Sequence, residues 1–311
     1  MEIKSKFRFY IKLLKETFNA FIDDKGLKLS ASLAYYTIFS LAPMLIVLLS
    51  IGGIFYGQDA LRGKVFNQLN DFIGNDAAMQ IQDMIQKLAL SDKSFVAFSV
   101  GIITLLIGAS GVFIEIQDSI NQIWRVKAVP KKGWLKLIVD RVLSLSMVAS
   151  LGFLLIVSLL INSVVLAFSN VLTRFLPDFT IVFIDVINIG ITFIVLMSLF
   201  GVIYKVLPDV EITWKQVKAG SFFTALLFML GKFIIGLYIK YAAVGDIYGS
   251  AGTVVIIAVW VYYSAAILFF GAEFTWAYAK LNHDIIKPSK YAVSLKQIEV
   301  EQGSKPVDLE N

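Results

Sequence analysis

Hydrophobic residues lie in long runs with few charges, and short polar stretches between the runs carry most of the charged residues. Six runs reach the about 20 apolar residues that a helix needs to cross a hydrocarbon core. They lie near residues 31–57, 94–118, 142–170, 179–204, 219–240 and 247–273. The pattern predicts an all-α, polytopic membrane protein whose six transmembrane helices form a domain of residues 29–280.

Three segments outside these runs have patterns of their own. Residues 1–28 predict an amphipathic helix that either lies in the membrane interface or packs on the bundle from the solvent side. Its apolar stripe consists of Phe7, Tyr10, Ile11, Leu14, Phe18, Phe21 and Ile22. Residues 59–93 predict an outer helical hairpin with a turn at 74–76, acting as a lid or as a packed cap. Residues 281–311 predict a polar tail.

The charges set the predicted orientation. Of 28 Lys and Arg residues, 21 lie in the N-terminal segment, the second and fourth connections and the tail, against six in the alternate connections. This asymmetry predicts that both termini are cytoplasmic. The composition, 58% hydrophobic and 16% charged, agrees with a membrane protein, since soluble domains contain about 25% charged residues. The net charge of +5 therefore indicates retained cytoplasmic cations, and we expect no nucleic-acid partner.

The chain has no cysteine, and His283 is its one histidine. These counts exclude disulfides and thiolate metal sites within the chain, and they disfavour a histidine-based triad or metal cluster. We expect no metal and no cofactor. The expected partners are membrane lipids and an unidentified solute or lipid, and the sequence leaves a homo-oligomer open.

Several ionisable residues fall inside the predicted membrane helices. Lys232 lies fourteen residues after Lys218, roughly 21 Å along a helix, and Glu115 lies ten residues before Arg125, roughly 15 Å. A charge at such depth needs a partner or water. One interpretation is a polar cavity lined by Glu115, Asp118, Lys232 and Glu273, to which Asp185 and Asn188 add further polar groups. The alternative is that Lys232 snorkels to an interface and both glutamates lie among headgroups.

Proline and glycine mark special backbone positions in the same helices. Pro43 predicts a kink that is either structural or a gating hinge. Gly108 and Gly111 in GASG, and Gly249 and Gly252 in YGSAG, predict close helix contacts. YGSAG has a second interpretation, as irregular backbone that lines a cavity.

Four motifs together resemble a known family. They are ASLAYYTIFSLAPML (31–45), GVFIEIQDSINQIW (111–124), LPDVEITWKQVKAGS (207–221) and YGSAGTVVIIAVWVYYSAAILFFGAE (248–273). In order and spacing they are similar to the YihY/BrkB family of bacterial inner-membrane proteins, over about residues 15–280. The resemblance implies six spans and a multi-pass protein of the bacterial inner (plasma) membrane. It supplies no catalytic residues, and the family's former ribonuclease label is generally regarded as mistaken. The motif positions of interest are Tyr35, Pro43, Glu115, Trp124, Pro208, Gly220, Tyr248, Gly249 and Glu273.

These patterns favour a transporter or permease of a small solute, ion or lipid, because ionisable groups inside spans, a kinked helix and glycine contacts are typical of a translocation path. The alternatives are a non-transporting scaffold or envelope-assembly factor, and an intramembrane lipid-modifying enzyme. We expect no enzymatic activity. Nuclease chemistry in particular needs a metal-binding carboxylate cluster in a basic groove, and one helical pair, Glu115 and Asp118, is thin support for it.

Overall fold

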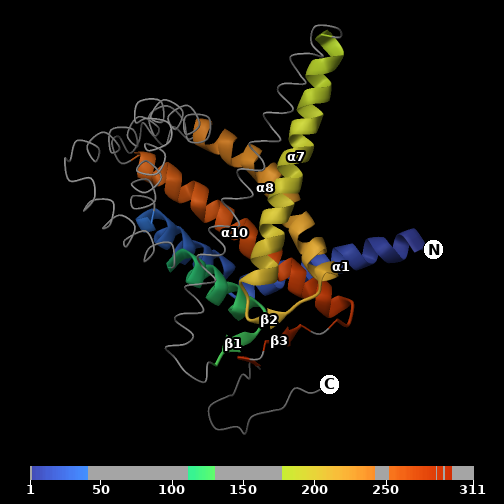
Figure 1. Ribbon diagram of the computed structural model, residues 1–311, viewed down its shortest axis with the longest axis vertical. Helices are drawn as coiled ribbons and strands as arrows, with labels where there is room; N and C mark the ends of the chain where they lie inside the picture. The colour runs from blue at the N-terminus through green and yellow to red at the C-terminus, as the bar shows by residue number, and fades with distance from the viewer. Residues whose placement is uncertain are drawn as a thin grey trace, which may run out of the picture.

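The computed structural model describes residues 2–40, 111–129, 177–241, 252–284, 286–289 and 291–295. Most of these residues are helical, in agreement with the predicted class. The helices are α1 (Glu2–Asp23), residues 26–40, residues 111–123, α7 (Pro177–Val206), α8 (Trp214–Tyr241) and α10 (Gly252–Leu281). The strands are β1 (Val126–Ala128), β2 (Val210–Glu211), β3 (Lys287–Pro288) and β4 (Ala292–Ser294). In Figure 1, α8 packs between α7 and α10, and the strands lie at the end where α7 stops.

Long apolar helices occupy the positions that the hydropathy pattern predicts. Within the described part of the chain, the windows Ile189–Val206 of α7 and Val255–Leu281 of α10 are apolar and long enough to cross a membrane, each with a mean hydropathy of 2.1. Helix α8 covers the run predicted at 219–240. The predicted spans 31–57, 94–118 and 142–170 and the hairpin 59–93 lie largely or wholly outside the described residues.

The helix over the last predicted span continues beyond Glu273. The prediction was 247–273, and α10 is described from Gly252 to Leu281, while residues 247–251 lie outside the described residues. The sequence FTWAYAKL after Glu273 remains apolar and helix-compatible, so the charge of Glu273 does not end the helix. The consequence for the site is that Glu273 lies in the interior of α10, two turns before its end.

Helix α1 packs on α10 through one face and leaves a second apolar face exposed. Leu13 is fully buried and clusters with Phe274 and Ala277 of α10. Of the predicted stripe, only Phe21 is buried. The other six side chains are 45–66% exposed: Phe7, Tyr10, Ile11, Leu14, Phe18 and Ile22. Packing on the bundle, one of the two alternatives, is therefore present, and the open apolar face is the feature that the interfacial alternative requires.

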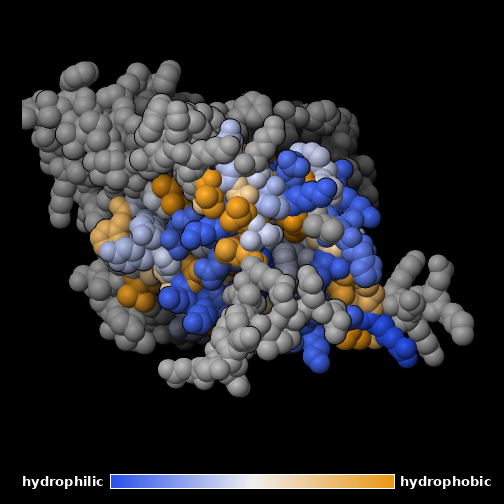
Figure 2. All heavy atoms as spheres, turned by 90° about the horizontal axis from the view of Figure 1, so that it is seen from below, coloured by the Kyte–Doolittle hydropathy of each residue, from blue (hydrophilic) through white to orange (hydrophobic). Residues whose placement is uncertain are grey.

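Short strands join segments far apart in the sequence, which the all-α prediction did not include. Strand β1 pairs antiparallel with β4, with Val126 opposite Ser294, and β2 pairs with β3, with Val210 opposite Pro288. Part of the predicted polar tail is thus folded against two connections. Strands of two or three residues are too short to show the alternation by which strands are recognised. Viewed from this end, hydrophilic side chains surround smaller hydrophobic areas (Figure 2).

Helices α8 and α10 approach each other closely through a reciprocal glycine–threonine contact. A Cβ atom at Gly220 of α8 would overlap the hydroxyl of Thr275 on α10, and a Cβ atom at Gly271 of α10 would overlap that of Thr224 on α8. Each threonine hydroxyl donates to the carbonyl of the glycine four residues earlier, at 2.7 Å. Small residues at crossing points allow helix backbones to approach closely in membranes. This contact sets the position of α10 and so of Glu273.

Candidate functional site

The side chain of Glu273 forms the centre of the candidate site. It is fully buried within the apolar helix α10, and among the described residues no N–H or hydroxyl group donates to either carboxyl oxygen, while the carboxyl group of Asp24 lies within hydrogen-bond reach. The charged groups that act on it are Asp24, Arg125 and Asp23. A buried charge without hydrogen bonds is costly, and buried carboxylates in proteins are normally paired, hydrogen-bonded or bound to an ion. Glu273 is therefore the described residue whose placement most requires a functional explanation.

Asp24 and Arg125 form a buried ion pair next to Glu273. The Nη1 atom of Arg125 donates to Oδ1 of Asp24 at 2.5 Å, and the two side chains are 23% and 2% exposed. The second oxygen of Asp24, Oδ2, is buried and has no partner. The cluster thus holds two carboxyl groups against one guanidinium, and three of their buried oxygens receive no N–H or hydroxyl donor from the described residues. A further cation, or a proton shared between the two carboxyl groups, would complete such a cluster.

Two turns in the backbone place the members of this cluster. Asp24 lies between α1 and the helix at 26–40, where Lys25 has a φ of 56°. The helix at 111–123 ends in the same way, because Arg125 has a φ of 57° and its N–H donates to the carbonyl of Gln122 at 3.1 Å. A residue in this left-handed conformation commonly ends a helix. Both ion-pair residues are therefore held at helix ends that meet beside α10.

Trp124 ties the end of the 111–123 helix to α10. Its indole Nε1–H donates to the carbonyl of Ala272 at 3.0 Å, immediately before Glu273 in the chain, and its side chain is 2% exposed. The ring also lies against Tyr204 of α7, with centroids 6.4 Å apart. A buried indole usually finds an acceptor for its N–H. Here that bond fixes the position of Arg125 relative to Glu273.

A second polar cluster holds the same helix to the connection after α7. Gln117 and Asn121 donate from their amide groups to Oδ2 of Asp209, at 3.1 and 2.8 Å, and the N–H of Asp209 donates to Oδ1 of Asn121 at 2.9 Å. Gln117 and Asn121 are 6% and 4% exposed. They lie four residues apart and so share one helical face. The hydrogen bonds among these three residues satisfy their buried polar groups, which indicates a structural role.

The other residues predicted to line the cavity lie in different surroundings. On the 111–123 helix, Glu115 is half-buried and Asp118 is exposed, and Lys232 is an exposed residue of α8. The sequence predicted Glu273 as a partner of Lys232. In the structure the charged groups that face Glu273 are Asp24, Arg125 and Asp23. A single cavity shared by all four predicted residues stays a prediction.

The remaining predicted positions divide by whether the structure describes them. Asp185 and Asn188 lie on α7, but their side chains are outside the described set. Gly111 faces the ring of Tyr36, which a Cβ would meet at 3.4 Å, an ordinary van der Waals distance, so its role as a close helix contact stays a prediction. Gly252 is the first residue of α10. Pro43, Gly108 and Gly249 lie outside the described residues.

Sequence reasoning missed Asp24 and used Arg125 only as an orientation charge. The two residues are 101 positions apart, and neither lies in an apolar run where a charge would attract attention. The one local signal was Arg125 directly after the motif ending in Trp124. Their pairing depends on which helix ends meet in space.

The comparisons with known proteins agree with these features. Residues 17–292 match the family model described as Virulence factor BrkB. The chain is 31% identical over 270 residues to a UPF0761 membrane protein of Verminephrobacter eiseniae, covering 84% of this chain and 60% of that protein. It is 27% identical over 262 residues to a UPF0761 membrane protein of Pseudoalteromonas atlantica, covering 83% of each chain.

A third relative is the ribonuclease-like protein YfkH of Bacillus subtilis, 25% identical over 271 residues, covering 85% of this chain and 94% of that protein. No solved structure matches the chain. The family model covers every element of the described site, from α1 beyond residue 17 to the start of β4. The chain is therefore an integral membrane protein that belongs to the Virulence factor BrkB family.

Proposed function

We propose that this chain is a transporter or permease of the bacterial inner membrane that carries a small solute, an ion or a lipid. The observation that carries the proposal is Glu273, a fully buried carboxyl group inside an apolar helix whose two oxygens receive no N–H or hydroxyl donor from the described residues. Intramembrane carboxylates without a structural partner mark ion and substrate pathways. The neighbouring ion pair of Asp24 and Arg125 gives the site a charged group that can exchange partners when an ion binds.

The proposed topology has six spans with both termini in the cytoplasm. It rests on the six apolar runs and on the excess of Lys and Arg in alternate connections. In this orientation the end of α7, the start of α8 and the end of α10 face the cytoplasm, together with the strands that join them. The Glu273 cluster then lies near the cytoplasmic end of the path and would control access from that side.

Single-cysteine labelling tests the proposal without knowledge of the substrate, because the chain has no native cysteine. Glu273→Cys is compared with Phe269→Cys, which is also fully buried and lies four residues earlier on the same helix face. Each variant is exposed to a membrane-impermeant thiol reagent in intact cells and in inverted vesicles. A transporter that alternates between states exposes its binding site to water, so we expect the Glu273→Cys variant to be labelled and the Phe269→Cys variant to stay protected.

Equal protection of the two variants would mean that the carboxylate site never meets water, and would favour the scaffold interpretation. Labelling of both variants to the same extent would indicate local unfolding of α10 rather than a path. Membrane levels and a monodisperse elution profile in detergent serve as controls for folding. Lys232→Cys, Glu115→Cys and Asp118→Cys extend the map and test whether the predicted cavity connects to Glu273.

A further inference from the structure

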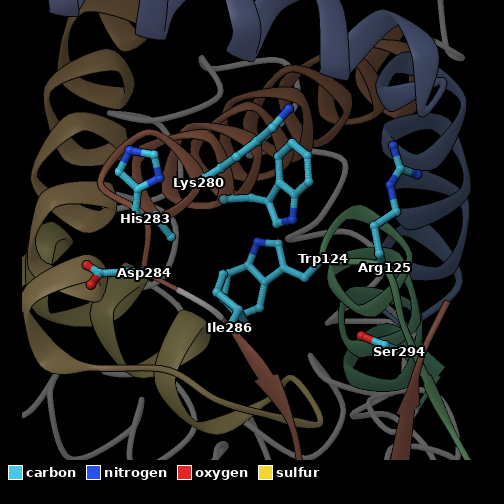
Figure 3. A pocket seen from close by; sticks show the side chains of 9 residues that line it. Trp124, Arg125, Lys280, His283, Asp284, Ile286 and Ser294 are labelled. Atoms are coloured by element: carbon cyan, nitrogen blue, oxygen red, sulfur yellow. The ribbon is translucent and has the colours of Figure 1, made fainter. Parts of the chain in front are cut away.

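A pocket at the end of α10 shares Trp124 and Arg125 with the surroundings of Glu273, but Glu273 itself does not line it. It has a volume of about 530 Å³, within the range of small-molecule sites. Its lining comes from the end of the 111–123 helix, the last turns of α10, the segment after α10 and β4 (Figure 3). The lining residues used below are Trp124, Arg125, Trp276, Lys280 and Asp284.

Two tryptophans form its apolar walls and two cations lie over one of them. The guanidinium of Arg125 lies 6.0 Å and the ammonium of Lys280 5.1 Å from the ring centroid of Trp276. Cations in such positions are attracted to the face of the indole ring. Trp124 is fixed by its bond to Ala272. One wall is therefore held in place, and both cations lie beside the cavity at the other.

Both cations keep donors for a ligand. Arg125 has five N–H donors, and Asp24 accepts from its Nη1 atom. Lys280 approaches Glu16 at 3.9 Å, which is too long for a hydrogen bond, and its side chain is 60% exposed. A phosphate group is the ligand that two such donors recognise best.

The opposite side of the pocket has a negative charge. Asp284 and His283 line it across from Arg125, with Trp124 between them (Figure 3). The N–H groups of Asn282, His283 and Asp284 donate back to carbonyls in the last turn of α10, at 2.9–3.2 Å, which caps that helix end. In Figure 3 the carboxylate of Asp284 is turned away from Trp124, so it can attract an ammonium group at this side of the pocket by its charge. The pocket thus offers cations at one side and an anion at the other.

The position of the pocket along α10 identifies the source of the ligand. The apolar window of α10 runs from Val255 to Leu281, and the pocket lies where this window ends, so we assign its last turns to the boundary of the membrane. Tryptophan is enriched at this depth, among the lipid headgroups. We propose that the pocket binds the headgroup of a zwitterionic phospholipid, with the phosphate at Arg125 and Lys280 and the ammonium at Asp284. This inference rests on membrane residence and does not depend on transport.

Native mass spectrometry of the purified full-length chain tests the inference. Delipidated protein is titrated with phosphatidylethanolamine, phosphatidylglycerol and phosphatidylcholine, and bound lipids are counted. We expect phosphatidylethanolamine to be retained most strongly. Lys280→Gln should weaken all three lipids about tenfold. Asp284→Asn should weaken phosphatidylethanolamine by about tenfold, phosphatidylcholine less because its ammonium donates no hydrogen bond, and phosphatidylglycerol not at all.

Matched exposed charges serve as controls, with Lys12→Gln for the cation and Glu211→Gln for the anion. Competition by soluble glycerophosphoethanolamine would support recognition of the headgroup itself, and so a phospholipid as the source of the ligand. Equal competition by inorganic phosphate would overturn the zwitterionic assignment. If both pocket variants retained all lipids as the wild type does, or if the wild type retained the three lipids equally, lipid binding would lie elsewhere and the proposal would be wrong.

Discussion

At the scale of single residues, the Asp24–Arg125–Glu273 cluster combines one satisfied pair with one unsatisfied charge. Removing one partner of a buried pair leaves an uncompensated charge, whereas removing both partners is often tolerated. Removing Arg125 should cost more here than in an isolated pair, because Glu273 already receives no hydrogen bond from a donor in the described residues. Arg125 is the one cation that faces both carboxylates in the described part of the chain. Its loss would leave two carboxylates facing each other.

We expect Arg125→Met to lower the free energy of unfolding by about 3–5 kcal/mol, measured by chemical denaturation of the purified protein in detergent. The double variant Asp24→Asn with Arg125→Met should be less destabilised than Arg125→Met alone, since the buried negative charge is gone. Lys12→Met, which breaks an exposed contact of 3.9 Å to Glu16, is the control and should cost less than about 1 kcal/mol. Strictly additive single and double effects would show that the pair is not coupled.

At the scale of elements, the crossing of α8 and α10 depends on two glycines, which lack a Cβ atom. Gly220 and Gly271 lie against threonines whose hydroxyls are held by their own helices. Tyr204 of α7 joins this contact, because its hydroxyl donates to the carbonyl of Leu268 at 2.7 Å and lies 3.0 Å from the hydroxyl of Thr224. The three long helices therefore meet at one polar point, and their relative positions are specified there.

Gly220→Ala should destabilise the protein by about 1–3 kcal/mol, the usual cost of overpacking a close contact. Gly190→Ala is the matched control, since no atom lies within 4 Å of a Cβ built there. It should be neutral or stabilising by up to about 1 kcal/mol through helix propensity. Thermal melts in detergent compare the two variants. Thr275→Ala should rescue Gly220→Ala only in part, because it removes the overlapping hydroxyl but keeps a Cβ at 2.9 Å from the new one. Thr275→Gly removes both atoms and should relieve the overlap further, and no difference between these two second-site variants and Gly220→Ala alone would argue against the contact.

At the scale of the whole molecule, the segment after α10 closes the end of the bundle. Strands β3 and β4 pair with β2 and β1, so one short segment joins the connection after α7 to the end of the 111–123 helix. The N–H of Leu295 also donates to the carbonyl of Arg125 at 2.7 Å. Arg125 belongs to the Glu273 cluster and also lines the pocket at the end of α10. Because the segment after α10 holds the backbone of Arg125, it supports both sites.

A truncation series checks this role. A stop after Leu295 keeps all four described strands and serves as the reference chain. A stop after Asp284 removes β3 and β4 and exposes Val126 and Val210, which are 3% and 9% exposed in the fold. Exposure of these two valines to solvent should lower the melting temperature by roughly 5–15 °C. Equal melting temperatures for the two truncated chains would contradict a supporting role.

Local patterns in the sequence were sufficient for the helices and the membrane class. The apolar runs over 179–204 and 247–273 predicted α7 and α10, because hydropathy over about twenty residues is a property of a continuous segment. The repeat of apolar residues in 1–28 predicted α1 for the same reason. It could not predict which face α1 turns to α10, since Leu13 and Phe18 are equally apolar and only the shape of α10 distinguishes them.

The sequence by itself determined that the chain is helical, membrane-embedded and furnished with a carboxylate at position 273, because each of these follows from neighbouring residues. Only the tertiary structure decided what that carboxylate faces. Asp24 and Arg125 are 101 positions apart, and Trp124 reaches the carbonyl of Ala272 across 148 positions. Contacts at such separations depend on how helices cross and where they end. Those crossings are set by packing at glycines and by left-handed turns, whose consequences appear only when the chain is folded.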